Sequence, residues 1–162
     1  MKKLVMITVF FSQVLFAQQN NLTIDLQPVG DSTINWETTL SLIAPDGVEN
    51  GMLIEIPVGL KMVPLSTSIN QTDMLLQNKT EVPSTDSVIC WDISPQGIIL
   101  IFRNGQLNSG DQITVKTMTT RIRKNLTDNA VVNIRSVQNV DSAIQYSEDV
   151  KSSANISLKI EN

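Results

Sequence analysis

Apolar and polar side chains alternate with a period of two along much of this chain, most clearly from Ile34 to Leu42. The inward set of that run is Ile34, Trp36, Thr38, Leu40 and Leu42, interleaved with Asn35, Glu37, Thr39 and Ser41. Because successive side chains of a strand point to opposite faces, this run predicts a strand with one buried and one solvated face. Since no sustained period of 3.6 occurs beyond the first 17 residues, we expect no long helix.

Comparable short runs recur, separated by turn signals roughly every eight to twelve residues. The further predicted strands span residues 22–26, 52–56, 58–63, 87–93, 97–102, 113–122, 130–137 and 154–160. This spacing is typical of an antiparallel two-sheet sandwich, Ig-like or jelly roll, with about eight or nine strands. The length of 162 residues favours a single domain, which we place at residues 18–162.

Several segments carry finer expectations. Residues 97–102 read GIILIF, which suits a central strand covered on both faces. Pro57 and Pro64 keep the strand at 58–63 short and near a sheet edge. In the strand at 87–93, Ile89, Trp91 and Ile93 share one side. Residues 66–87 are polar and predict a long connection, with one helical turn at most over 73–77.

Two turn signals lie close together between residues 104 and 111. Asn104-Gly105 has the composition of a type I′ hairpin turn, and Ser109-Gly110-Asp111 makes a second reversal. Leu107, between them, is expected to fill the edge of the core. The apolar positions then change parity after Thr117, which predicts a β-bulge near residues 116–118; an exposed strand end with no parity demand is the alternative.

The N-terminus has the pattern of a secretory signal peptide. Lys2 and Lys3 precede a mostly apolar run at 4–16, and Ala17 offers a small residue for cleavage. This interrupted run is shorter than the roughly 20 apolar residues of a membrane-spanning helix. We therefore expect a signal peptide at 1–17, cleavage after Ala17, and a mature protein outside the cytosol, secreted or in the periplasm or cell envelope, with no integral membrane span.

Charge and cysteine content restrict the partners. Without Lys2 and Lys3, ten basic side chains face sixteen acidic ones. An acidic chain is a poor ligand for nucleic acid, so we expect a protein partner or self-association. Cys90 is the only cysteine, so no internal disulfide can form, and its apolar neighbours predict a buried, inert thiol with a raised pKa.

The chain lacks histidine, which removes Ser-His-Asp and Cys-His catalysis and the commonest zinc sites. Paired carboxylates could still hydrolyse glycosides, but no motif selects a pair. Calcium is the one plausible metal, yet Asp46, Asp128 and Asp141 follow no calcium-loop spacing. Trp36 and Trp91 occupy the apolar phase of their strands, so we expect core residues rather than a sugar platform. We predict no enzymatic activity, no catalytic residue, no cofactor and no metal.

Several motifs occur in an order that resembles the Ig-like β-sandwich modules of bacterial cell-surface proteins, of the tandem-repeat type. The matching stretches are IPVGLKMV at 56–63, Trp91, LNSGDQITVK at 107–116, DNAVVNI at 128–134 and SANISLKI at 153–160. The segment GIILIFRNGQ lies between the Trp91 strand and the turn that begins at Leu107, and this additional strand makes the chain resemble cohesin-type nine-stranded jelly rolls as well. The resemblance implies a non-catalytic module at the cell surface.

Three functions remain open at this point. The first is an exported structural or adhesive module that makes protein–protein contacts at the cell envelope. The second is a secreted filament subunit that assembles by N-terminal strand donation, with Leu22, Ile24 and Leu26 as the inserted side chains. The third is a cohesin-like or carbohydrate-binding module.

Overall fold

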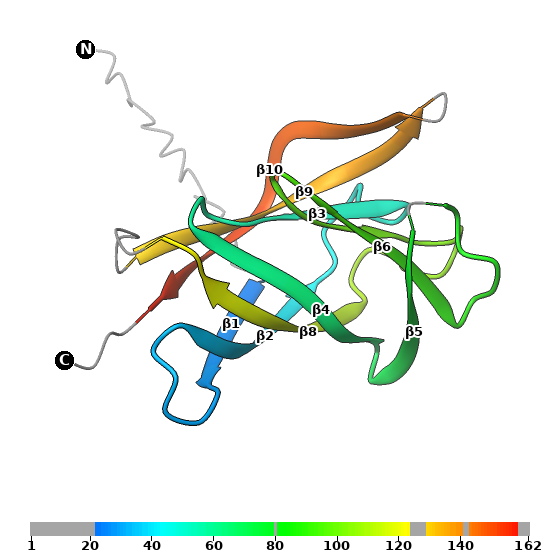
Figure 1. Ribbon diagram of the computed structural model, residues 1–162. Helices are drawn as coiled ribbons and strands as arrows, with labels where there is room; N and C mark the ends of the chain where they lie inside the picture. The colour runs from blue at the N-terminus through cyan, green and yellow to red at the C-terminus, as the bar shows by residue number, and fades with distance from the viewer. Residues whose placement is uncertain (1–21, 80, 124–128, 141–142, 159–162) are drawn as a thin grey trace, which may run out of the picture.

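The computed structural model describes residues 22–79, 81–123, 129–140 and 143–158, and all its regular elements there are strands (Figure 1). The predicted signal peptide at 1–17 lies outside these residues. The strands are β1 Leu22–Pro28, β2 Asn35–Ile43, β3 Gly51–Glu55, β4 Leu60–Ile69, β5 Thr72–Asn78, β6 Val88–Ser94, β7 Gly97–Ile101, β8 Gln112–Arg121, β9 Asn129–Val140 and β10 Ala143–Ser157. The all-β prediction is confirmed, with ten strands in place of eight or nine.

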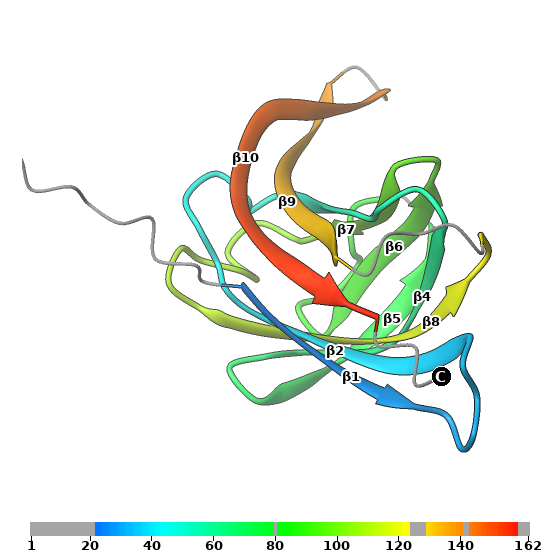
Figure 2. The ribbon, with the colours of Figure 1, turned by 90° about the vertical axis from the view of Figure 1, so that its left-hand side faces the viewer.

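All ten strands belong to one sheet, in the order β1-β2-β8-β4-β5-β6-β7-β3-β9-β10. The start of β5 pairs with β4 antiparallel at Thr72, and its end pairs with β6 in parallel from Leu75 to Asn78. Thus β5 carries the sheet from a layer of β1, β2, β8 and β4 to a layer of β6, β7, β3, β9 and β10 (Figure 2). The prediction of two separate antiparallel sheets is corrected in two ways, because β5 joins the layers and one pair is parallel.

The inner face of the first layer is built in rungs across β2, β8 and β4. From one end to the other these are Trp36–Thr119–Met62, Thr38–Thr117–Pro64, Leu40–Val115–Thr67 and Leu42–Ile113–Ile69. All of these side chains are buried. The alternation predicted for 34–42 is therefore confirmed from Trp36 onward, and Trp36 is a core residue.

The predicted bulge in β8 is wrong, because β8 keeps its odd-numbered residues inward through Thr119. Thr117 and Thr119 are buried, whereas Met118 is only partly so. The irregularity lies opposite, in β4, where Pro64 pairs with Thr117 but Ser66 pairs with Lys116. Threonine can occupy these inward positions since the hydroxyls bond to each other, at 2.6 Å for Thr38–Thr119 and 3.3 Å for Thr117–Thr119.

The prediction for residues 58–87 also needs correction. β4 does not stop at Pro64 but continues to Ile69, and β5 occupies the segment where a connection with a helical turn was expected. The two strands form a hairpin because Asn70 and Gln71 both have positive φ, 48° and 67°, as a two-residue type I′ turn requires. Asparagine tolerates this conformation better than most residues, but glutamine gives no such signal.

The stretch 104–111 reverses the chain without forming a hairpin. Gln106 N–H donates to the Arg103 carbonyl at 2.9 Å, and of the two central residues only Gly105 has positive φ, +79°. The type I′ prediction for this turn is therefore wrong. The turns instead carry the chain from β7 in one layer to β8 in the other, and Leu107 is fully buried between them, as expected.

Strand β7 is buried on both faces, as its sequence predicted. Ile98 and Leu100 face the main core between the layers. Ile99 and Ile101 face outward into a second apolar cluster with Leu53, Cys90 and Val137, against which Val88, Ile144 and Tyr146 pack. In β6, Ile89 joins the main core and Trp91 packs against it, whereas Ile93, near the end of the strand, is exposed.

Candidate functional site: the seam between the first and last strands

Strand β1 lies at one edge of the sheet and pairs only with β2, in a continuous register from Leu22 opposite Leu42 to Pro28 opposite Trp36. Leu22 is buried, and Ile24 and Leu26 are half-buried against the main core. The three side chains proposed as strand donors thus share the inward face and fill the core of their own chain.

Strand β10 lies at the other edge of the same sheet and pairs only with β9. The two terminal strands nevertheless contact each other, and Ile156 of β10 belongs to the same core as Leu22 (Figure 2). Within the described residues no strand pairing joins them. We call this boundary between β1 and β10 the seam. Among the described residues, each strand there has one edge whose backbone N–H and C=O groups join no strand pairing.

A bend divides β10 into two parts. Tyr146 pairs with Val137 but Val150 pairs with Arg135, so β10 contains extra residues, and a second shift follows before Ser152. The part after the bend lies at the seam, since Ile156 reaches the main core. The part before it covers the second cluster through Ile144 and Tyr146 (Figure 1).

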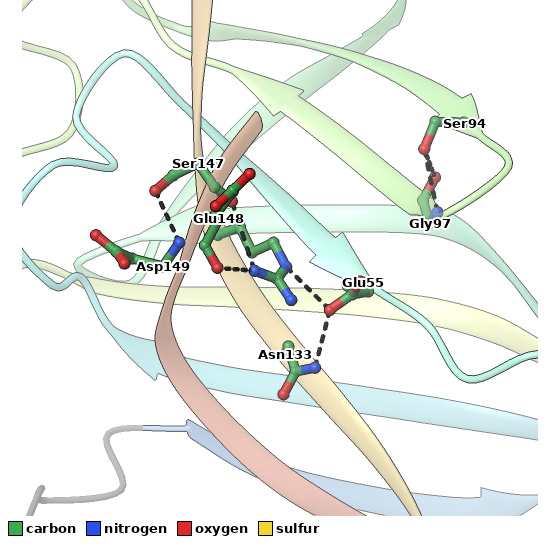
Figure 3. A network of polar contacts seen from close by, with 8 residues as sticks. Glu55, Ser94, Gly97, Asn133, Ser147, Glu148 and Asp149 are labelled. Atoms are coloured by element: carbon green, nitrogen blue, oxygen red, sulfur yellow. Dashed lines mark hydrogen bonds and ion pairs between the residues drawn. The ribbon is translucent and has the colours of Figure 1, made fainter. Parts of the chain in front are cut away.

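Arg135 of β9 stabilises this bend. Its Nε donates to Glu55 Oε2 of β3 at 3.1 Å, and its Nη1 donates to the carbonyls of Ser147 and Glu148 (Figure 3). Asn133 donates to the same Glu55 oxygen at 2.8 Å. Because the bulge leaves the carbonyls of 147 and 148 outside the ladder, the guanidinium supplies donors that a strand partner would otherwise give.

Sequence reasoning missed this network, although a signal for it existed. Glu55 ends an apolar strand, and Arg135 interrupts the apolar pattern of 130–137. A charged residue in each of two buried strands favours an ion pair between them. The sequence did not, however, indicate that β3 and β9 are neighbours, nor that β10 bends.

The loops at the end of the molecule where β1 begins hold a second set of polar contacts. Asp111 accepts from the Asn70 side chain at 2.8 Å and from the Asn108 N–H at 2.8 Å. These bonds, with the Asn70 side chain as the larger cause, hold the pKa of Asp111 below its usual value. Gln112 N–H donates to Asn70 Oδ1 at 2.9 Å, so this cluster ties the β4–β5 turn to the start of β8.

Of the three calcium candidates, Asp46 alone lies within the described residues. Asp46 accepts a hydrogen bond from the Ser109 hydroxyl, and Asp128 and Asp141 lie outside the described residues. No group of three or more Cys, Asp or Glu side chains is placed to hold a metal in the part of the chain that the structure describes. Asp46 therefore joins the β2–β3 loop to the β7–β8 loop through this hydrogen bond.

The structure also places Cys90 and the carboxylates Glu55 and Glu37. Cys90 is fully buried in the second cluster, and burial raises the pKa of its thiol, as expected. Glu55 is engaged by Arg135, and Glu37 lies in the opposite layer on β2. None of the described residues forms a helix long and apolar enough to cross a membrane.

Comparison with known proteins adds little to this description. No protein-family model matches the chain, and no curated protein matches it. Among solved structures, the chain is similar to a collagen-binding domain from a Staphylococcus aureus adhesin, with 10% sequence identity and a TM-score of 0.43, over 84% of this chain and 95% of that one. What this chain does has to be inferred from its own residues.

Proposed function

We propose that the chain is an exported, non-enzymatic structural or adhesive module that makes protein–protein contacts at the cell envelope. The observation that carries this proposal is the seam, where two terminal strands lie side by side and, within the described residues, each has one edge that no strand pairs with. An open strand edge is a surface on which a partner's extended segment adds by backbone hydrogen bonds.

Composition supports the same function. A chain without histidine, with its one thiol buried, has few groups that transfer protons or attack a substrate near neutral pH. The acidic balance favours protein partners over nucleic acid. In this proposal the leader at 1–17, cleaved after Ala17, delivers the protein outside the cytosol. The resemblance of the sequence to Ig-like modules of cell-surface proteins supports the same role.

Site-specific photo-crosslinking in the cells that produce the protein tests this function. A photoreactive amino acid replaces exposed Thr23 or Gln27 on β1, and a control chain carries it at exposed Leu75 on β5. We expect a defined crosslinked protein from the β1 positions, in the cell envelope or medium, and none from residue 75. Crosslinks of equal yield from all three positions, or none from β1, would contradict the proposal.

A filament subunit that assembles by strand donation is the second candidate. It is favoured by the position of β1, which is an edge strand held by one neighbour, with two of its three apolar side chains only half-buried. Such a strand can leave its own domain and insert Leu22, Ile24 and Leu26 into the same place in a second copy.

Sizing combined with a buried-charge variant tests strand donation. In Ile24→Asp the strand can fill neither its own core nor a neighbour's, whereas Asp25→Ala changes the exposed face of the same strand. Filaments or oligomers that persist in Asp25→Ala and disappear in Ile24→Asp are the expected result. A wild-type protein that stays monomeric on concentration, with β1 amides as protected as those of β2, rules strand donation out.

A further inference from the structure

Four exposed apolar side chains gather at the end of the first layer where β1 terminates. They are Val29, Ile34, Ile122 and Val58, exposed by 41%, 51%, 62% and 73%, and they flank β1, β2, β8 and β4, which are consecutive neighbours in the sheet. We call these four residues the apolar rim. Single exposed apolar residues are ordinary, but several at the ends of neighbouring strands favour an interaction surface.

Backbone hydrogen bonds place the members of the rim next to one another. Val29 N–H donates to the Asn35 carbonyl at 3.1 Å, which joins the β1 end to the β2 start. The Ile34 carbonyl accepts from Arg121 N–H at 2.8 Å, and Ile122 N–H donates to the Gly59 carbonyl at 2.8 Å. The segments that carry the rim are therefore consecutive neighbours along this end of the layer.

The charges around the rim are mostly positive. Three basic residues lie here: Lys61 at the start of β4, Arg121 at the end of β8, and Arg123 two residues later. Asp31 is the one acidic residue in the β1–β2 connection. This is unusual for a chain whose formal net charge is −4. A partner with an acidic surface would therefore be attracted to this end by charge complementarity.

The opposite end of the same molecule is acidic. Three described segments, 43–50, 70–73 and 103–112, form the loops there (Figure 2). They carry Asp46, Glu49, Asp73 and Asp111, against Arg103 within the same loops and Lys151 of β10, whose side chain lies beside Gly47. Hydrogen bonds from Asn70 and Asn108 to Asp111, and from Ser109 to Asp46, tie these loops to each other. The acidic surface is thus presented by cross-linked loops rather than by separate side chains.

We propose that a second copy of this chain docks its acidic loop end onto the apolar rim and the basic residues around it. The two surfaces lie at opposite ends of strands that run the length of the molecule, so the contact is head to tail and repeats along a row of copies. This contact involves neither β1 exchange nor the seam, so it holds or fails independently of the function proposed above.

Sedimentation velocity of the purified chain over a range of concentrations tests the proposal, at about 20 mM and about 500 mM salt. We expect wild-type association that rises with concentration and weakens in high salt. The double variant Val58→Asp/Ile122→Asp should weaken association about tenfold or more. Leu75→Asp, at an equally exposed apolar residue on β5, is the matched control and should associate like wild type.

Charge reversal makes the test specific for the two ends. Arg123→Glu should weaken association at low salt, and adding Asp73→Lys to the same chain should restore it, since the complementary charges are then exchanged. Unchanged thermal unfolding of each variant shows that the fold is retained. A wild-type chain that remains monomeric, or a rim double variant that associates like wild type, overturns the proposal. Loss of association in Ile24→Asp alone would instead assign self-association to strand donation.

Discussion

Arg135 connects three neighbouring strands of the second layer, its own β9 and the adjacent β3 and β10. It pairs with Glu55 on β3 and donates to two carbonyls of the β10 bend. Both charged side chains are partly buried, so loss of Arg135 leaves Glu55 with Asn133 as its remaining partner among the described residues.

The first prediction concerns this residue. Arg135→Ala should lower the free energy of unfolding by about 2 kcal/mol, since hydrogen bonds to a charged group are lost and bulge carbonyls are left unpaired. It should also speed reaction of Cys90 with a thiol reagent, because the covering strand over the second cluster loosens. Urea unfolding and labelling kinetics measure the two effects. Arg103→Ala breaks an exposed pair with Asp86 and should cost less than about 1 kcal/mol with no change in labelling.

The second prediction concerns Gly97, where β7 begins. A Cβ built there lies 1.9 Å from the Ile54 carbonyl oxygen, which is backbone and cannot move aside. Gly97→Ala should therefore destabilise the protein by about 2 kcal/mol or more. Gly105→Ala is the control, since nothing lies within 4 Å and only its φ of +79° opposes the substitution, at about 1 kcal/mol. Equal unfolding midpoints for the two variants would contradict this account.

The third prediction is that valine substitutions at two buried threonines change the stability of the protein in opposite directions. Thr38 Oγ1 bonds to Thr119, whereas Thr67 Oγ1 is buried with no partner among the described residues. Thr67→Val should raise stability by about 1 kcal/mol, because an unsatisfied hydroxyl is replaced by a methyl group of similar size. Thr38→Val should lower it by about 1 kcal/mol or more, since the bond to Thr119 is lost. Thermal unfolding decides, and shifts of the same sign would refute the explanation.

At the scale of the elements, the sequence predicted strands better where one face is plainly apolar. β2 and β7 follow their patterns because every inward residue but one is large and apolar. β8 does not, because Thr117 and Thr119 are inward and satisfy their hydroxyls within the core. An apolar count cannot detect a buried threonine, so it assigned the bulge to β8 when β4 contains it.

Turns and neighbours were less predictable than strands. The β4–β5 hairpin rests on positive φ at Gln71, which composition does not signal, and the parallel β5–β6 pair depends on contacts distant in sequence. For the candidate site, the sequence identified β1 and its inward side chains. It could not identify the seam, which exists only because β10 ends beside β1.

The fourth prediction concerns the loop cluster that joins β4–β5 to β8. The folded state lowers the pKa of Asp111 below its unfolded value, so Asp111 contributes stability that is present above the unfolded pKa. That contribution is lost as pH falls through the folded pKa. Asp111→Asn should therefore show a smaller loss of stability between about pH 7 and pH 3 than wild type. Urea midpoints at several pH values measure this, and parallel pH profiles would contradict it.

At the scale of the whole molecule, the sheet begins and ends at adjacent strands, and in the part of the chain that the structure describes these two strands do not pair with each other. This leaves a domain with a continuous core but two open edges on one side. Pairing β1 with β10 would add backbone hydrogen bonds and remove both exposed edges. A seam left unpaired is therefore a place where a partner's strand could add.

The fifth prediction concerns the whole chain in its cell. If the leader acts as proposed, the protein recovered from producing cells begins at Gln18 and is found outside the cytosol. Mass spectrometry of fractionated cells measures both properties. Recovery of the chain from the cytosol with its first 17 residues intact would contradict export.

Residue-resolved hydrogen exchange of the purified protein tests the seam most directly. If β1 and the last part of β10 are open edges, their amides exchange by local opening, well before those of β2 and β8, and gain protection when the crosslinking partner binds. Exchange of β1 and β10 at the same rate as β2 and β8, with no change on partner binding, would contradict the claim that the seam is the binding site.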